Sequence, residues 1–255
     1  MLKQDQTNGN FQKVHFLKNL YLGEMNIMNI IICTIKSWNI ALAEKLKRKS
    51  KHNVYIITEK DQLNFSNVKK IDPDYIFFPH WSYYISEDIY KTFQCVLFHM
   101  TDLPFGRGGS PLQNLIERGY SETFISAIKV VGDVDAGPIY YKEPLPLYGS
   151  ASEIYYRASK IIFNKMIPTI IKENKEPVMQ TGEVVTFERR TPEQSELYSN
   201  MKLEQIYDHI RMLDAEGYPN AYIKFGAFKI SFSKALQNFD SITCHAEIKE
   251  EKYDE

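Results

Sequence analysis

The run MNIIICTI, residues 28–35, is the clearest strand signal in this sequence of 255 residues. An apolar run rich in β-branched residues is typical of a strand that a parallel sheet buries on both faces. The next segment, SWNIALAEKLKRKS at residues 37–50, has helical spacing and ends in basic residues, which favour a helix C-terminus. We therefore expect the folded domain to begin at residue 28 with a strand followed by a helix.

The same alternation of strands and helices continues along the chain. We expect strands within residues 53–60, 73–81, 93–100 and 123–131, a turn leading into a strand at residues 132–141, and helices at residues 110–119 and 151–174. Strands that alternate with helices in this way favour right-handed crossovers and a parallel sheet. The sequence therefore predicts a doubly wound, Rossmann-like, mostly parallel α/β sheet.

The pattern changes near residue 186. Beyond that point, FERRTPEQSEL at residues 187–197 precedes a helical pattern at residues 203–213 and aromatic alternation at residues 218–236. We expect a small C-terminal α+β extension here. The predicted organisation is an N-terminal extension at residues 1–27, a main domain at residues 28–185 and a C-terminal subdomain at residues 186–255.

The composition of the chain restricts which partners it is expected to bind and in which cellular compartment we expect it. The 31 basic and 32 acidic residues give a net charge of −1, so no overall positive field attracts nucleic acid. Cys33, Cys95 and Cys244 lack the paired spacing of a zinc site or a disulfide framework. No apolar run approaches the length that spans a bilayer. We expect a cytoplasmic protein with reduced thiols, no membrane partner and no nucleic-acid partner.

The segment FHMTDLPFGRGGSP, residues 98–111, is the main candidate for a functional site. It places His99 at the end of an expected strand and then forms a glycine-rich loop, which favours close approach of backbone to a ligand. In a doubly wound sheet, ligands bind at the carboxyl ends of the strands. Asp133 and Asp135 follow in the turn DVDAGP. Histidine and aspartate form a minimal proton-transfer pair if the two strand ends are adjacent. The alternative is that both residues are structural, the histidine at the end of its strand and the aspartates through bonds to nearby backbone amides.

Other catalytic patterns are absent from the sequence. It contains no GxSxG turn, no HxxxH spacing, and no lysine with serine or threonine in the glycine loop, as a phosphate-binding P-loop requires. A serine hydrolase, a histidine-rich metal site and a P-loop nucleotidase are therefore disfavoured. We expect no metal.

The segment HMTDLPFGRGGSP together with VDAGPI, residues 134–139, resembles the folate-dependent formyltransferases of the methionyl-tRNA formyltransferase-like superfamily. The C-terminal segment is similar to the sugar N-formyltransferase branch. The resemblance implies that His99 and Asp135 are the catalytic pair, and that N10-formyltetrahydrofolate is the formyl donor. The residues implied to bind this donor are His80, Trp81, Ser82, Tyr83, Tyr84, Ile85 and Asp133.

The loop itself is expected to receive the acceptor substrate. Arg107, Gly108, Gly109 and Ser110 are the candidate substrate-binding residues, because an arginine fork suits phosphate and a glycine backbone allows close approach. A structural role for Arg107, through bonds to neighbouring carbonyls, is the open alternative.

One position departs from the family pattern. Leu97 stands where the family carries an asparagine whose amide holds the formyl oxygen. Thr101, Gln113 and Asn114 are candidate replacements, being near in sequence. A noncatalytic relative that binds folate or a nucleotide sugar is the alternative reading.

The resemblance also implies an acceptor. The sequence of the motif is similar to that of enzymes that formylate a UDP-linked 4-amino-4,6-dideoxy sugar. Such enzymes act in pseudaminic-acid-type pathways for bacterial surface glycans. The near-neutral charge disfavours aminoacyl-tRNA, which together with other small amines is the alternative acceptor. A homodimer is possible through the aromatic C-terminal segment.

Overall fold

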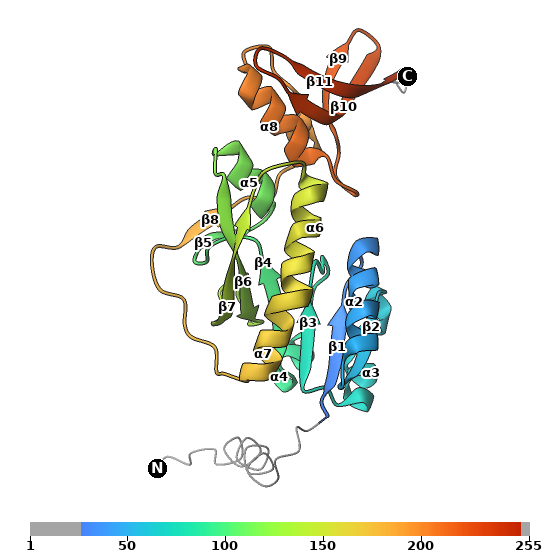
Figure 1. Ribbon diagram of the computed structural model, residues 1–255, viewed down its shortest axis with the longest axis vertical. Helices are drawn as coiled ribbons and strands as arrows, with labels where there is room; N and C mark the ends of the chain where they lie inside the picture. The colour runs from blue at the N-terminus through green and yellow to red at the C-terminus, as the bar shows by residue number, and fades with distance from the viewer. Residues whose placement is uncertain (1–26, 251–255) are drawn as a thin grey trace.

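The computed structural model describes residues 27–250, and the expected N-terminal extension lies almost entirely outside this range. Figure 1 shows a central sheet flanked by helices, with a smaller helix-and-sheet unit at the C-terminal end. Along the part of the chain that the structure describes, no helix has the length and apolarity to cross a membrane.

Six strands form the central sheet in the order β2-β1-β3-β4-β6-β7. They are β1 (Asn29–Cys33), β2 (Asn53–Ile57), β3 (Tyr75–Phe78), β4 (Cys95–His99), β6 (Glu122–Lys129) and β7 (Ile139–Pro146). The pairs among β1 to β4 are parallel, and β6 and β7 add to the sheet in antiparallel fashion. The prediction of a mostly parallel, Rossmann-like sheet is confirmed.

The burial of strand β1 on both faces explains why its sequence is apolar throughout. Ile30 and Ile32 pack into one buried cluster, whereas Ile31 and Cys33 pack into a second cluster. Because successive side chains of a strand point to opposite faces, a sheet covered on both faces needs apolar residues at every position. The sheet is therefore covered on both faces.

Helices cover the two faces of this sheet (Figure 1). They are α2 (Ser37–Lys49), α3 (Phe65–Ile71), α4 (Glu87–Thr92), α5 (Pro111–Glu117), α6 (Ala151–Ile161) and α7 (Ile167–Glu173), with short 3-10 turns at Lys60–Gln62 and Pro192–Ser195. The long helix expected at residues 151–174 is interrupted by a π-helical turn at Ile162–Met166. Ser150 and Glu153 form a capping box at its start, which satisfies its free backbone N–H groups.

The C-terminal unit contains one more element than the sequence indicates. It comprises α8 (Leu203–Leu213), β9 (Ala221–Phe225), β10 (Phe228–Gln237) and β11 (Ile242–Glu250), with strand order β11-β10-β9. Strand β11, in which apolar and polar residues alternate, lies beyond residues 218–236, where the sequence analysis expects strand-like alternation.

A small two-stranded sheet joins the glycine loop to the start of the C-terminal region. Strand β5 (Phe105–Gly108) pairs in parallel with β8 (Val185–Phe187). The expected domain boundary at residue 186 falls inside β8, whose pairing links it to the main sheet region. Residues 28–185 and the C-terminal unit are therefore connected through the loop that the sequence singles out.

Candidate active site

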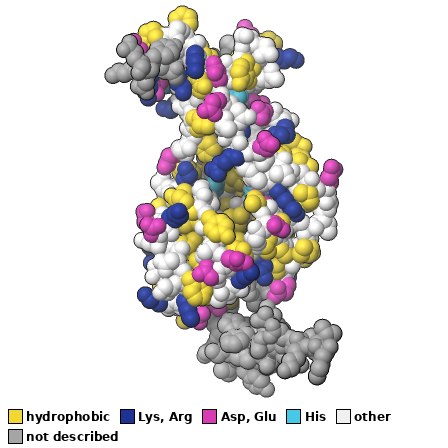
Figure 2. All heavy atoms as spheres, turned by 180° about the vertical axis from the view of Figure 1, so that it is seen from behind, with side chains coloured by type: hydrophobic (Ala, Val, Ile, Leu, Met, Phe, Trp, Pro, Cys, Tyr) yellow, Lys and Arg dark blue, Asp and Glu magenta, His cyan; other side chains and the backbone are white. Residues whose placement is uncertain are grey.

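One large cavity opens at the carboxyl ends of β3 and β4. Its volume is about 830 Å³, within the range typical of small-molecule sites. Figure 2 shows its mouth near the middle of one face, with basic and histidine side chains beside it. The cavity is lined mainly by residues 80–85, 108–111, 128–135 and 189–192, together with Gly137 and the C-terminal residues Leu213, Gly217, Tyr218 and Pro219.

His99 and Asp135 come together as the sequence predicts. His99 Nδ1 lies 3.4 Å from Asp135 Oδ2, and both side chains are more than nine-tenths buried. Asp135 Oδ2 also accepts a 2.9 Å hydrogen bond from the Gly108 backbone N–H. On its other side, His99 Nε2 lies 2.8 Å from the Gly106 carbonyl oxygen. The pair thus sits beneath the glycine loop, and Asp135, unlike His99, reaches the cavity wall.

The glycine loop is shaped by its pairing with β8. Gly106 and Gly108 have φ values of +76° and +102°, a region that side chains other than glycine rarely adopt. A Cβ at Gly108 would overlap the backbone oxygen of Phe187. Glycine is therefore required for close approach to β8, a neighbouring strand, as well as for any approach to a ligand.

Arg107 does not line the cavity. Its Nε and Nη2 atoms donate hydrogen bonds of 3.1 and 2.7 Å to Gln180 Oε1. Gln180 Nε2 in turn donates to the carbonyl oxygens of Asp135 and Gly137, each at 2.8 Å. These contacts run through the Gln180 side chain and not through the neighbouring carbonyls of the structural alternative, and they tie the glycine loop to the turn that holds Asp135.

His80 adopts an unusual backbone conformation at the cavity wall. Its φ of +53° is left-handed, which is uncommon for a residue other than glycine. Its Nδ1 atom lies 3.1 Å from Asn39 Nδ2, whose amide also faces the Pro79 carbonyl and is thereby oriented as a donor. Burial, followed by the charge of Lys36, lowers the pKa of His80 to about 4. His80 is therefore a neutral group at neutral pH.

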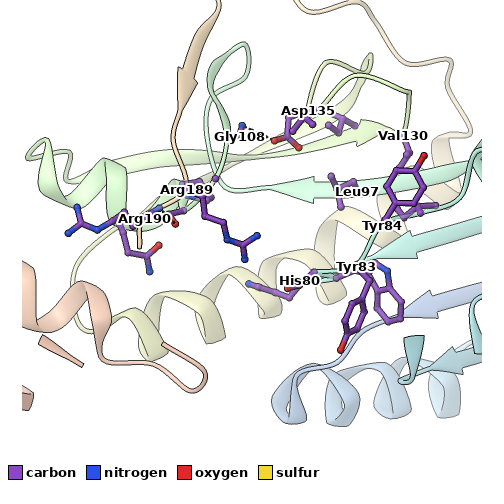
Figure 3. A pocket seen from close by; sticks show the side chains of 18 of the residues that line it. His80, Tyr83, Tyr84, Leu97, Gly108, Val130, Asp135, Arg189 and Arg190 are labelled. Atoms are coloured by element: carbon purple, nitrogen blue, oxygen red, sulfur yellow. Dashed lines mark hydrogen bonds between the residues drawn. The ribbon is translucent and has the colours of Figure 1, made fainter. Parts of the chain in front are cut away.

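The cavity has an aromatic end (Figure 3). Tyr83 and Tyr84 are 42% and 80% exposed, and Trp81 packs edge-on against Tyr83 at a ring distance of 5.3 Å. Figure 3 shows Leu97 and Val130 on the wall beside these rings, close to Asp135. The Trp81 Nε1 atom is buried without a hydrogen-bond partner among residues 27–250. This end offers flat aromatic surface.

The opposite end is basic. Arg189 projects into the cavity toward His80 (Figure 3), and within the described residues its guanidinium has no hydrogen bond or ion pair. Its neighbour Arg190 is held by Glu117 at 2.7 Å and by the Gln194 carbonyl at 2.6 Å. Lys36 also lines this end. Arg189 is thus available for an anionic ligand.

The three candidate replacements for the family asparagine lie in different surroundings. Thr101 Oγ1 donates to the Gly106 carbonyl at 3.3 Å and does not line the cavity. Asn114 Nδ2 donates to three carbonyls, those of Gly109, Ser110 and Glu188. Gln113 lines the cavity, but its Nε2 donates to Tyr155 Oη and the Met212 carbonyl. Each amide or hydroxyl donor is therefore already occupied.

The structure gathers most of the predicted binding residues in one place. The cavity wall includes His80, Trp81, Ser82, Tyr83, Tyr84, Ile85, Asp133, Gly108, Gly109 and Ser110. Sequence reasoning missed Lys36, Gln180 and Arg189. Arg189 lies in FERRTPEQSEL, the start of the C-terminal segment that resembles the sugar N-formyltransferase branch, but the resemblance assigns it no role. Between residues 27 and 250, no cluster of three or more metal-ligating acidic, histidine or cysteine side chains occurs.

Comparison with known proteins identifies the family. A solved structure described as a methionyl-tRNA formyltransferase from Clostridium thermocellum is 57% identical, with a TM-score of 0.86, and the match covers 88% of this chain and all of that one. A family model for the C-terminal domain of methionyl-tRNA formyltransferase matches residues 192–249.

More distant relatives agree on the fold. The curated methionyl-tRNA formyltransferase of Bacillus thuringiensis (strain Al Hakam) is 29% identical over 174 residues, which are 65% of this chain and 54% of that protein. The chain thus matches about half the length of this curated relative. WlaRD, a sugar 3N-formyltransferase solved in the presence of dTDP and 5-N-formyl-THF, is 14% identical with a TM-score of 0.57, covering 88% of this chain and 98% of that one. The chain belongs to the methionyl-tRNA formyltransferase-like superfamily of formyltransferases.

Proposed function

We propose that this protein transfers a formyl group from N10-formyltetrahydrofolate to the amino group of a nucleotide-linked amino sugar. The observation that carries the acceptor class is the unpaired guanidinium of Arg189 at the basic end of the cavity, opposite the aromatic end. Arginine binds phosphate through two parallel hydrogen bonds, so a ligand with a diphosphate suits this end. A UDP-linked 4-amino-4,6-dideoxy sugar of a pseudaminic-acid-type pathway is our first candidate.

The aromatic end fits the folate donor. A pterin is flat, which suits the exposed rings of Tyr83 and Tyr84. Trp81 Nε1, buried without a partner, is a further donor at this end. When bound, the donor supplies an activated formyl group; WlaRD, which shares the fold, was solved with a related formyl-folate.

His99 and Asp135 supply the proton chemistry in this proposal. In the tautomer that carries its proton on Nδ1, toward Asp135, the His99 Nε2 atom exchanges its contact with the Gly106 carbonyl for one to substrate and takes up a proton from the attacking amine. That proton is then delivered to N10 of the folate as the bond between N10 and the formyl carbon breaks. Asp135 holds the ring from the Nδ1 side. Hydrogen bonds of this kind are often aligned differently before substrate binds. Since Leu97 cannot donate to the formyl oxygen, charge developing there is stabilised by fewer donors than the family pattern offers.

The test is a panel of nucleotide amino sugars incubated with N10-formyltetrahydrofolate and read by mass spectrometry for a formyl gain. For an accepted sugar, Arg189→Ala is expected to raise the acceptor KM by about 10-fold or more, because a charge-assisted hydrogen bond contributes roughly 1.5–3 kcal/mol. The folate KM stays near its original value. Arg48→Ala, which removes the same charge from an exposed site on α2, is the matched control. Absence of formyl gain across the panel refutes the acceptor class.

Aminoacyl-tRNA is the second candidate acceptor. It is favoured by the 57% identical structure, which is described as a methionyl-tRNA formyltransferase, and by the match at residues 192–249. Against it, residues 192–250 contain nine acidic and six basic side chains, which disfavours binding to phosphate backbone. Methionyl-tRNA belongs in the same assay as a separate acceptor. Formylation of tRNA at a rate above that of every sugar would make it the substrate.

A further inference from the structure

The sheet of the C-terminal unit has one face that is almost entirely apolar. Residues directly opposite each other in antiparallel strands share a face. The register places Phe228 opposite Phe225, and Ile230 between Ile223 and Ile248. The other face of the same strands is polar and charged.

Helix α8 covers only one end of this apolar face. Ala221 is fully buried there and Phe232 packs against the main core. At the far end, Phe225, Phe228 and Ile248 are 70%, 42% and 64% exposed. We refer to these three side chains as the distal patch. Figure 2 shows apolar side chains at the surface of this unit, at the top of the view. Exposed apolar patches on soluble proteins often mark interaction sites.

Strand β11 forms a free edge beside the distal patch. Within residues 27–250, no strand pairs with its outer side, and all its side chains after Ile242 are exposed. At the opposite edge of the sheet, β9 is partly covered, because Leu197 N donates to the Tyr222 carbonyl at 2.8 Å. A nine-residue unpaired edge is a template for another strand, and proteins usually protect such edges.

We propose that β11 pairs with β11 of a second copy of this chain, in antiparallel fashion about a two-fold axis at Ala246. This register is the one that overlaps all of residues 242–250 of both copies. The opposed pairs are then Ala246 with Ala246, His245 with Glu247, Cys244 with Ile248, Thr243 with Lys249, and Ile242 with Glu250. No two like charges face each other, and the smallest side chain of the strand stands at the axis.

The two-fold pairing also extends the apolar face. An axis perpendicular to the sheet places the apolar faces of both copies on the same side, so the two distal patches flank a continuous six-stranded sheet. Ile248 of each copy is covered by Cys244 of the other. The cavity uses Leu213 and residues 217–219 from the other end of this unit, so it stays open in the dimer.

The first test is the oligomeric state of the full chain. Sedimentation velocity between about 1 and 100 µM is expected to show a reversible dimer, as an interface of modest area allows. Ala246→Lys places two like charges at the axis and is expected to raise the dissociation constant at least about 10-fold. Gln237→Lys, which adds the same charge at the exposed end of β10, is expected to leave the dimer intact. Circular dichroism checks folding.

The second test determines the register of the two β11 strands by cysteine cross-linking, without a substitution that disrupts the dimer. In a Cys244→Ser background, Ala246→Cys places two thiols opposite each other across the axis, where the separation of directly opposed residues suits a disulfide. Mild oxidation is expected to give a covalent dimer, whereas Cys244 in the unmodified chain faces Ile248 and gives none. Cys33 and Cys95 are buried and do not interfere. A chain that stays monomeric, a dimer that Ala246→Lys leaves unchanged, or thiols that fail to cross-link would each overturn the proposal.

Discussion

At the scale of single residues, backbone groups on both sides hold the pair of His99 and Asp135. The Gly108 N–H restrains the carboxylate, and the Gly106 carbonyl restrains the far nitrogen of the imidazole. The same loop therefore positions both side chains. Arg107, which the sequence suggests as a ligand, donates in this structure to Gln180, which links the loop to the turn of Asp135.

For the pair itself, we expect His99→Ala and Asp135→Asn each to lower kcat by at least about 10²-fold. The reason is that one removes the proton-carrying atom and the other removes the charge that orients it. Thermal unfolding should show that both variants fold, because the pair lies at strand ends. Steady-state kinetics with the accepted sugar is the measurement. Near-normal turnover in either variant would remove that residue from the mechanism.

For Arg107, we expect Arg107→Ala and Gln180→Ala to behave alike. Each breaks the link between the glycine loop and the Asp135 turn, so kcat falls and both the folate and the acceptor KM rise. The melting temperature should fall by several degrees, since a buried or half-buried hydrogen bond to a charged group contributes roughly 1.5–3 kcal/mol. A rise in the acceptor KM alone, with unchanged stability, would show that Arg107 binds substrate.

At the scale of elements, the turn between β6 and β7 depends on close backbone contact. Gly137 lies against the Lys129 carbonyl, and the Lys129 N–H donates to the Pro138 carbonyl at 2.8 Å. Both strands then run antiparallel into the sheet. This contact brings Asp135 back over the end of β4, where His99 is located.

A glycine-to-alanine pair tests this turn. A Cβ at Gly137 would overlap the Lys129 oxygen, so Gly137→Ala should destabilise the protein by about 3 kcal/mol and lower kcat by displacing Asp135. Gly132→Ala is the control for stability, because its Cβ would meet only Tyr90 Oη at 3.6 Å. Calorimetry compares the stability of the two variants, and kinetics compares Gly137→Ala with the wild type. Equal stability of the two variants would contradict the role given to this contact.

At the scale of the whole molecule, the cavity lies at the junction of the main sheet region and the C-terminal unit. Tyr155 of α6 stacks on Tyr218 at 5.7 Å and donates a 2.7 Å hydrogen bond to its hydroxyl. His80 packs edge-on against the same Tyr155 ring. The stability of the whole protein is therefore coupled to a neutral histidine at this junction.

The pH dependence of stability follows from His80. Its pKa is about 4 in the folded protein and near 6.5 when unfolded, because burial disfavours the charged ring. Between these values only the unfolded state binds the proton, so stability is complete above pH 6.5 and falls as the pH drops toward 4. The expected loss is about 1.4 kcal/mol per pH unit. Burial also lowers the pKa of His209 and adds to the same trend.

Denaturant unfolding of the wild type and of His80→Asn measures this slope. Asparagine tolerates the left-handed backbone at this position and does not titrate, so the variant should lose stability more gradually on acidification. His209→Asn serves as a comparison at a buried histidine away from the cavity. Identical slopes in the wild type and His80→Asn would show that His80 is not the titrating group.

The sequence by itself determined the central sheet, because apolar runs and their spacing are local properties that hold whatever the chain packs against. It also indicated the meeting of His99 and Asp135, since strands of one sheet bring their ends together. The role of Arg107 was decided by tertiary structure, because its partner Gln180 is 73 residues away. The position of Arg189 at the cavity was likewise decided by tertiary structure, because residue 189 packs against Gly109 of the glycine loop. Pairing with β10 decided the place of β11, although its alternation of apolar and polar residues is itself a strand pattern.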